Sequence, residues 1–234
     1  MDEPQSYLFR VFRASERLNR EEILGLLERR PGGALLDCGC GDGAFTAELA
    51  ARSETRPHGI EAVPARARAA VARGVRTAIA DLNAPFPFAA ASFHVVHANQ
   101  VIEHLRSTDH FLREVRRVLR PDGVALLSTN NLASWHNVVS LALGFQPPPA
   151  HVSSEVLVGN PFDPLHGQAI DHPEDSHLRL FSGRALAELC RHHGLRVETL
   201  KTVAYYPLPP RLARWATRLD RRHGAFLVAR LAAA

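Results

Sequence analysis

The sequence predicts an α/β fold in which helices cover both faces of a largely parallel sheet. Short apolar segments that end in glycine or polar residues alternate with segments of helical periodicity over residues 33–130. The strand-like segments are nearly continuous apolar runs, which is typical of parallel strands buried on both faces. Because 234 residues suit one elaborated domain, we predict a single doubly wound domain.

The predicted elements follow one another in a regular order. Residues 4–30 carry apolar side chains at helical spacing and predict one or two helices that end at Pro31. Strands are predicted at 34–39, 58–61, 75–81, 93–99, 124–129, 195–203 and 226–231. Helices are predicted between them at 44–52, 64–73, 108–119, 131–144, 182–193 and 210–222.

We divide this one domain, residues 1–234, into four parts. A helical cap (1–32) precedes a core (33–130), and a C-terminal part (182–234) completes the sheet. Between them, residues 145–180 contain six prolines and few periodic apolar positions. Because so long an irregular stretch in a compact domain is usually functional, we expect residues 131–181 to form a lid over a substrate.

Composition and charge narrow the class of protein. The net charge is only +4 and no basic stripe is evident, so we expect no nucleic-acid partner. The start MDEPQSYLFR lacks a secretory signal, and no apolar run reaches the roughly 18 residues of a membrane span. Three cysteines fit free thiols in a reducing compartment. We therefore expect a cytoplasmic protein without a membrane span, acting as a monomer or homodimer.

The helix predicted at 210–222 places arginines opposite Leu208, Leu212, Trp215 and Leu219. We expect this apolar stripe to be buried beneath a solvated basic face. A basic amphipathic helix can alternatively lie on a membrane or meet an acidic partner.

The segment LLDCGCGDGAF (35–45) is the most informative part of the chain. Gly39, Gly41 and Gly43 stand where the first strand turns into a helix, and glycine lets the backbone turn sharply and approach a ligand. The helix that follows offers unpaired N–H groups to an anion. Glu61 ends the second strand, 22 residues after Gly39, where a carboxylate can accept both hydroxyls of a ribose. A nucleoside-containing cofactor is therefore indicated.

Two further carboxylates bear on the choice of cofactor. Asp37 precedes the glycines and Asp81 closes the third strand, so three carboxylates meet at the carboxyl ends of neighbouring strands. Such a ring suits a positively charged ligand and repels a diphosphate. With Ala44 the loop also satisfies G-x-G-x-x-A, so a nicotinamide cofactor stays open on the loop alone.

Together, LLDCGCGDG, Glu61 and the segments 80–105 and 114–131 resemble a class I S-adenosylmethionine-dependent methyltransferase, in particular small-molecule enzymes related to the quinone C-methyltransferases. The resemblance implies a Rossmann-like sheet of seven strands whose last strand is antiparallel. It implies S-adenosyl-L-methionine as cofactor, S-adenosyl-L-homocysteine as product and a small-molecule acceptor, in specialised or glycan metabolism. It also implies these cofactor-binding residues: Asp37, Gly39, Cys40, Gly41, Glu61, Ala62, Asp81, Leu82, Asn99 and Gln100.

Histidines are the candidates for proton transfer and substrate binding. His104 follows the fourth strand and is the best-placed general base, because imidazole titrates near working pH; it can alternatively pack against or cap the adjacent helix. In the lid, Trp135, His172 and His177 are the candidate acceptor contacts. His166, His172 and His177 with a carboxylate could hold a metal ion, but no helix holds them at ligand spacing, so we assign no metal site.

Two other function classes stay open at this point. One is a nicotinamide-dependent oxidoreductase, against which Asp37 and Asp81 count. The other is a non-catalytic S-adenosylmethionine-binding partner subunit on the same fold.

Overall fold

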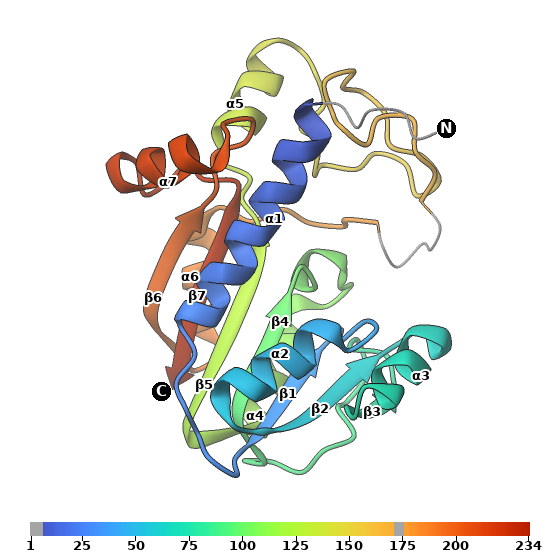
Figure 1. Ribbon diagram of the computed structural model, residues 1–234, viewed down its shortest axis with the longest axis vertical. Coiled ribbons are helices and arrows are strands. Elements are labelled where there is room, and N and C mark those ends of the chain that lie inside the picture. The colour runs from blue at the N-terminus through green and yellow to red at the C-terminus, as the bar shows by residue number, and fades with distance from the viewer. Residues whose placement is uncertain (1–6, 171–175) are drawn as a thin grey trace.

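The computed structural model describes residues 7–170 and 176–234 (Figure 1). Within them, one seven-stranded sheet has the order β3-β2-β1-β4-β5-β7-β6. The strands are β1 (Ala34–Cys38), β2 (Arg56–Glu61), β3 (Arg76–Ile79), β4 (Phe93–Asn99), β5 (Leu119–Asn130), β6 (Leu195–Val203) and β7 (Phe226–Ala233).

The direction of the strands confirms the predicted mixed sheet. β1 pairs in parallel with β2 and β4, and β4 pairs in parallel with β5. β7 lies between β5 and β6 and is antiparallel to both. Because β1, β2 and β4 run in the same direction, the loops after them meet at one edge of the sheet.

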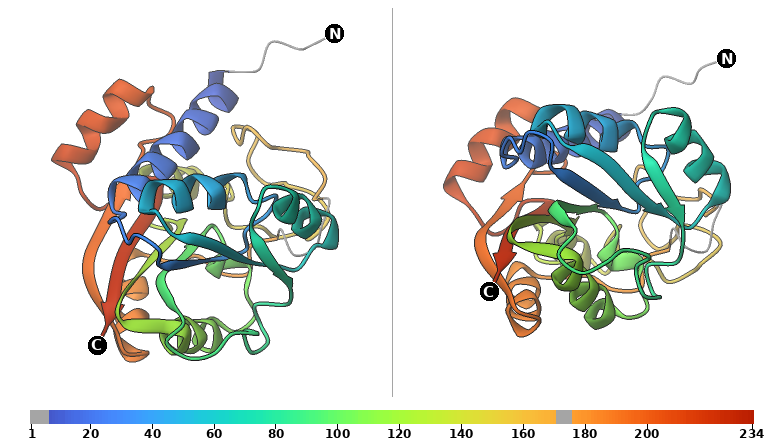
Figure 2. Two further views of the ribbon diagram at one scale, coloured as in Figure 1. Left: turned by 60° about the horizontal axis from the view of Figure 1, so that its bottom comes forward. Right: turned by 90° about the horizontal axis from the view of Figure 1, so that it is seen from below.

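Helices form a layer on each side of the sheet (Figure 2). One layer holds α1 (Tyr7–Gly25), α2 (Ala44–Ser53), α3 (Pro64–Ala72) and α7 (Pro210–Leu219). The other holds α4 (Thr108–Val118) and α6 (Gly183–His192). Because side chains alternate along a strand, Leu35 joins the core beneath α1 and α2, whereas Leu36 joins the core beneath α4 and α6. Two apolar layers therefore hold the sheet.

The lid is a loop whose two ends meet beside the carboxyl end of β5. Asn131 forms a parallel bridge with Phe181, and the N–H of Leu132 donates to the carbonyl of Phe181. Between these ends lie the short helix α5 (Trp135–Ala142) and an irregular stretch with an isolated bridge between Val156 and Ala169.

Several predicted boundaries move. The described part of the first helical region is one helix, α1, that ends at Gly25. β5 begins at Leu119, five residues earlier than predicted, because the turn around Asp122 is absorbed as an irregularity in the pairing between β4 and β5.

The expectation of a buried apolar stripe on α7 is wrong. Leu212, Trp215 and Leu219 are 52%, 60% and 69% exposed, respectively. The helix instead faces the molecule through the small side chain of Ala213, and Arg214 forms an ion pair with Glu21 of α1. Across the described residues, no helix has the length and apolar character that a membrane span requires.

Candidate active site

The glycine loop after β1 has the backbone that the sequence predicts. Gly39, Gly41 and Gly43 have φ values of +74°, +55° and +79°, which strongly favour glycine. A Cβ on Gly39 would lie 2.7 Å from Val101, and one on Gly43 would lie 2.7 Å from the backbone of Ala70. A Cβ on Gly41 would have no atom of the described residues within 4 Å beyond its chain neighbours, so the loop is open to a ligand on that side.

Glu61 lies directly against this loop. Its Oε2 accepts a hydrogen bond from the N–H of Gly41 and its Oε1 accepts one from the N–H of Val63, both at 2.9 Å. Ala62, the next residue, is exposed. Since a carboxylate oxygen can accept more than one hydrogen bond, Glu61 can orient the loop and still accept ribose hydroxyls at its open side.

Asp37 is buried beneath the loop and is 4% exposed. Its Oδ1 lies 2.7 Å from Nδ1 of His97, and its Oδ2 accepts a 2.5 Å hydrogen bond from the hydroxyl of Thr46 in α2. Phe45 packs edge-on against His97. Asp37 therefore ties β1, β4 and α2 together, and we missed His97 and Thr46 because only the fold brings them beside it.

Asp81 and Leu82 follow β3 at the edge expected for an adenine. Asp81 is exposed, and both hydrogen bonds that it accepts from Asn83 fall on Oδ1. Leu82 is buried. Asn83 in turn accepts a hydrogen bond from the N–H of Arg106, which holds the segment after β3 against the segment after β4.

Cys40 contacts the loop through both backbone and side chain: its carbonyl accepts from the N–H of Gly43, and its thiol lies 3.9 Å from the carbonyl of Gly41. Its side chain packs in a small apolar cluster with Ala70 and Val75, on the side of α3. Burial raises the pKa of the Cys40 thiol to about 12, and Asp37 and Glu61 add to the shift. A thiol with so high a pKa is a poor nucleophile at neutral pH.

The ends of β4 and β5 are joined to α1 by a polar network. The Asn19 amide donates to Oδ1 of Asn99 at 2.7 Å, and Oγ of Ser128 donates to Oδ1 of Asn19 at 2.8 Å. Gln100, whose φ is +56°, donates to the same Ser128 hydroxyl at 3.3 Å. The two predicted cofactor-binding residues Asn99 and Gln100 thus belong to one network, and Asn19 is the member that the sequence did not reveal.

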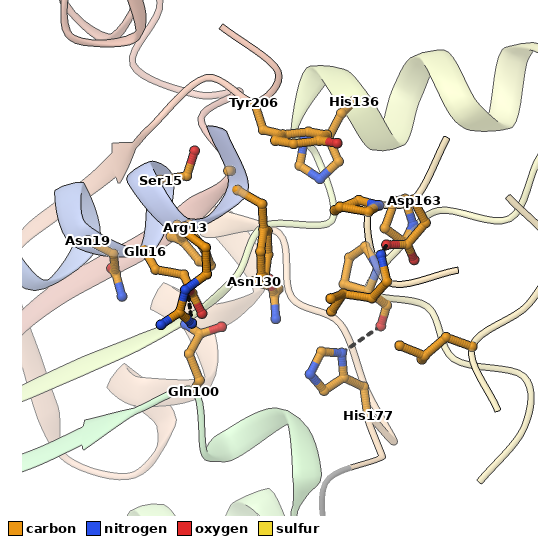
Figure 3. A pocket seen from close by; sticks show the side chains of 18 of the residues that line it. Arg13, Ser15, Glu16, Asn19, Gln100, Asn130, His136, Asp163, His177 and Tyr206 are labelled. Carbon is orange, nitrogen blue, oxygen red and sulfur yellow. Dashed lines mark hydrogen bonds and ion pairs between the residues drawn. The ribbon is translucent and has the colours of Figure 1, made fainter. Parts of the chain in front are cut away.

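A cavity of about 780 Å³ begins at this network. Figure 3 shows side chains of α1, such as Ser15 and Glu16, on one side and those of His136, Asp163 and His177 on the other. Asn99 and Gln100 also line the cavity. The cavity therefore extends from the end of β4 outward, between the cap and the lid.

Three histidines form a row at the lid side of the cavity. His104 and His177 have ring centroids 4.7 Å apart, and His177 stacks on His151 at 4.2 Å. Nδ1 of His104 lies 3.1 Å from the carbonyl of Ser176, and Nδ1 of His177 lies 2.8 Å from the carbonyl of Pro149. Burial, together with His104 and His151, lowers the pKa of His177 to about 3, so His177 is neutral at physiological pH.

Glu103 lies beside this row and is fully buried. Its Oε1 accepts a long hydrogen bond, 3.4 Å, from the Asn130 amide. Burial raises the pKa of Glu103 to about 7, opposed by the neighbouring Thr129 and Asn130. Although Thr129 is near, Oε2 has no partner in hydrogen-bond geometry among the described residues.

The opposite wall of the cavity is aromatic and weakly polar. His136 and Tyr206 have ring centroids 5.4 Å apart, and burial lowers the pKa of His136 to about 4. The Tyr206 hydroxyl is buried without a partner in the part of the chain that the structure describes. We did not predict His136 because a single histidine in a short helix carries no motif.

Trp135 does not lie where we predicted. Its indole N–H donates to Asp220 at 2.9 Å and its ring packs against His223, so it points toward the C-terminal end of α7 and does not line the cavity. These contacts instead join the start of α5 to the residues that follow α7. His172, the remaining predicted acceptor contact, lies outside the described residues.

The strand order, with the glycine loop after β1 and carboxylates after β2 and β3, defines the architecture of a class I methyltransferase. The open backbone at Gly41 and the absence of cationic residues in the loop itself fit a positively charged nucleoside cofactor. A family model described as a methyltransferase domain matches residues 10–200. The chain therefore belongs to this methyltransferase family, which does not support the oxidoreductase alternative.

Known relatives agree with this assignment. A probable S-adenosylmethionine-dependent methyltransferase of Mycolicibacterium smegmatis is 35% identical over 170 residues, 72% of this chain and 63% of that protein. The 27-O-demethylrifamycin SV methyltransferase of Amycolatopsis mediterranei is 31% identical over 119 residues, 47% and 43% of the two chains. This chain thus covers less than two thirds of the length of either relative.

A solved structure shows the same fold. An S-adenosylmethionine-dependent methyltransferase of Thermotoga maritima matches with a TM-score of 0.62 and 21% identity, over 96% of this chain and 91% of that chain.

Proposed function

We propose that the protein transfers a methyl group from S-adenosyl-L-methionine to a small-molecule acceptor, releasing S-adenosyl-L-homocysteine. The observation that carries this proposal is the cavity of about 780 Å³ that begins at Asn99 and Gln100, beyond the glycine loop. Its size suits a small molecule. An acceptor bound there would lie beside Asn99 and Gln100, which the resemblance implies are near the methyl end of the cofactor.

The proposed chemistry asks little of the protein beyond positioning. When bound, the cofactor supplies a methyl group on a positively charged sulfur, and the bond from acceptor to methyl forms as the bond from methyl to sulfur breaks. The chain must align the acceptor and exclude water. The network around Asn19 holds α1 over the strand ends, and the lid closes the other side.

An acceptor hydroxyl or enol must also lose a proton. We assign this task to the histidine row, because His151 and His177 line the cavity and an imidazole nitrogen can accept a proton. His104, the predicted base, contacts His177 and does not line the cavity itself. Proton removal therefore involves His151 or His177, the two members of the row that line the cavity.

The wider setting is part of the same proposal. The Amycolatopsis mediterranei relative is named for the methylation of 27-O-demethylrifamycin SV, which supports a small-molecule acceptor, and we propose a role in specialised or glycan metabolism. We further propose that the protein is related to the quinone C-methyltransferases, that it lies in the cytoplasm, and that it acts as a monomer or homodimer.

Calorimetric titration with S-adenosylmethionine, S-adenosylhomocysteine and NAD tests the proposal. We expect both sulfur nucleosides to bind and NAD not to bind. Glu61→Ala should weaken S-adenosylhomocysteine binding at least tenfold, about 1.5 kcal/mol, because it removes charge-assisted contacts. Glu188→Ala, on the exposed side of α6, is the matched control and should bind normally. NAD binding alone, or normal binding by Glu61→Ala, would refute the assignment. Binding without methyl transfer to any acceptor would favour a non-catalytic subunit.

A further inference from the structure

His177 lies beside Glu103 and His104 although more than 70 residues separate it from them in the sequence. One oxygen of Glu103 and one ring nitrogen of each histidine all lie within 4.8 Å of one another. The N–H groups of Leu178 and Arg179 donate to the Glu103 carbonyl, at 2.8 and 3.2 Å, and hold the lid against the segment after β4. The backbone therefore fixes this cluster, which does not depend on long flexible side chains.

The orientation of both imidazoles suits ligands of a metal ion. A ring nitrogen that faces a carbonyl oxygen must donate, so Nδ1 carries the proton in His104, facing Ser176, and in His177, facing Pro149. In the neutral rings the lone pair then lies on Nε2. Histidines that bind metals typically donate their other N–H to a carbonyl or carboxylate in this way.

The third ligand provides an independent observation. Glu103 is fully buried, and its Oε2 makes no hydrogen bond within the described residues. A buried carboxylate oxygen without a partner is costly, and a cation removes that cost. Asn130 donates to the other oxygen, as second partners of ligating carboxylates do.

We propose that Glu103, His104 and His177 bind one divalent transition-metal ion at the edge of the acceptor cavity. Two imidazoles and one carboxylate favour Zn²⁺ or a similar ion over Mg²⁺, which prefers oxygen ligands. Ligating atoms about 2.0–2.2 Å from zinc are at most about 4.4 Å apart, so small side-chain rotations must close the cluster.

The proposed ion has a role that rests on the proposed function. His177 lines the cavity, so an ion held by this cluster would lie close to a bound acceptor. An acceptor oxygen bound to the ion has a lowered pKa and releases its proton more readily. The site thus favours acceptors with a metal-binding oxygen, such as a catechol, a hydroxyketone or adjacent sugar hydroxyls. With the ion bound, His104 and His177 are both ligands and not bases, and the proton of the acceptor passes to solvent instead of to His177.

The test is binding of Zn²⁺ to chelator-treated protein, measured by calorimetry and by metal analysis after gel filtration. We expect one tightly bound equivalent per chain. Glu103→Gln and His177→Ala should each weaken binding at least tenfold. His166→Ala, an exposed lid histidine, is the matched control and should bind Zn²⁺ normally. Co²⁺ bound at the site should give the visible absorption bands typical of a low coordination number, and both variants should lose these bands.

Each other outcome has a defined meaning. The inference is overturned if no Zn²⁺ binds at concentrations up to about 100 μM. It is also overturned if both variants bind Zn²⁺ as tightly as the unsubstituted protein. Loss in His166→Ala would place the ion in the lid instead and overturn it as well. Circular dichroism shows whether each variant is folded. Glu103→Gln preserves the size and shape of the buried side chain. S-adenosylhomocysteine binding is measured in the same samples, so a failed metal site is distinguished from a failed cofactor site.

Discussion

At the scale of single residues, the acidic positions differ in what they do. Asp37 and Glu61 both follow from the sequence pattern, yet only Asp37 is held by side chains that the pattern did not single out. Asp37 is held by His97 and Thr46, whereas Glu61 accepts hydrogen bonds from the glycine loop itself. Both oxygens of Asp37 are thus engaged by side chains of β4 and α2, and Glu61 is the better candidate for a direct cofactor contact.

Glu114 allows a prediction about pH at this scale. It is buried, accepts a 2.7 Å hydrogen bond from the N–H of Phe86 and binds Arg117 through both oxygens. The hydrogen bonds from Arg117 lower the pKa of Glu114 from its ordinary value of 4.5. A lowered carboxyl pKa stabilises the fold above the unfolded pKa, and this contribution disappears as pH falls through the folded pKa.

We therefore expect Glu114→Gln to lower the free energy of unfolding by about 1.5–3 kcal/mol at pH 7, measured with urea. The difference from the unsubstituted protein should shrink below pH 4.5. Asp122→Asn, in an exposed ion pair with Arg120, is the control and should change little. An equal loss at pH 7 and pH 3.5 would contradict this account.

At the scale of elements, the glycine loop and α2 are fitted against α3. A Cβ on Gly43 would approach the Cα of Ala70 to 2.7 Å, and a helix backbone cannot move aside easily. Gly41 also has a positive φ, but a Cβ added there would meet no atom within 4 Å among the described residues other than its chain neighbours. Substitutions at these two positions therefore separate the stability cost of backbone strain from the cost of a clash with α3.

Gly43→Ala should cost clearly more stability than Gly41→Ala, for which about 1 kcal/mol of conformational strain is expected. Gly41→Ala should nevertheless weaken S-adenosylhomocysteine binding, because its methyl group projects into the open side of the loop. Thermal unfolding and calorimetry measure the two effects. Equal destabilisation by both substitutions would show that packing against α3 is unimportant.

At the scale of the whole molecule, α1 couples the N-terminal region to the strand ends. Asn19 of α1 reaches Asn99 and Ser128, which lie 80 and 109 residues away in the sequence. Additional ion pairs, such as Lys201 with Glu22, lie at the surface of α1 and are worth little. The buried amide therefore sets the position of the cap.

Asn19→Leu keeps the approximate size of the side chain but removes both hydrogen bonds. We expect the free energy of unfolding to fall by about 2 kcal/mol, because two buried polar groups lose their partner. S-adenosylhomocysteine affinity should fall as well, since the cap is no longer held over the strand ends. Glu22→Gln serves as control, and unchanged affinity in Asn19→Leu would show that the cap acts independently of the cofactor site.

The sequence by itself determined the features that depend on residues close together along the chain. The glycines between β1 and α2 are required by a local backbone turn, and the alternation of strands and helices follows from hydrophobic periodicity, so loop, sheet and cofactor class were predictable. Only the tertiary structure decided which distant side chains meet. It exposed the apolar side of α7, turned Trp135 away from the cavity and brought His177 beside Glu103 and His104. Such contacts depend on how elements pack across the sheet, and a short-range pattern carries no information about that packing.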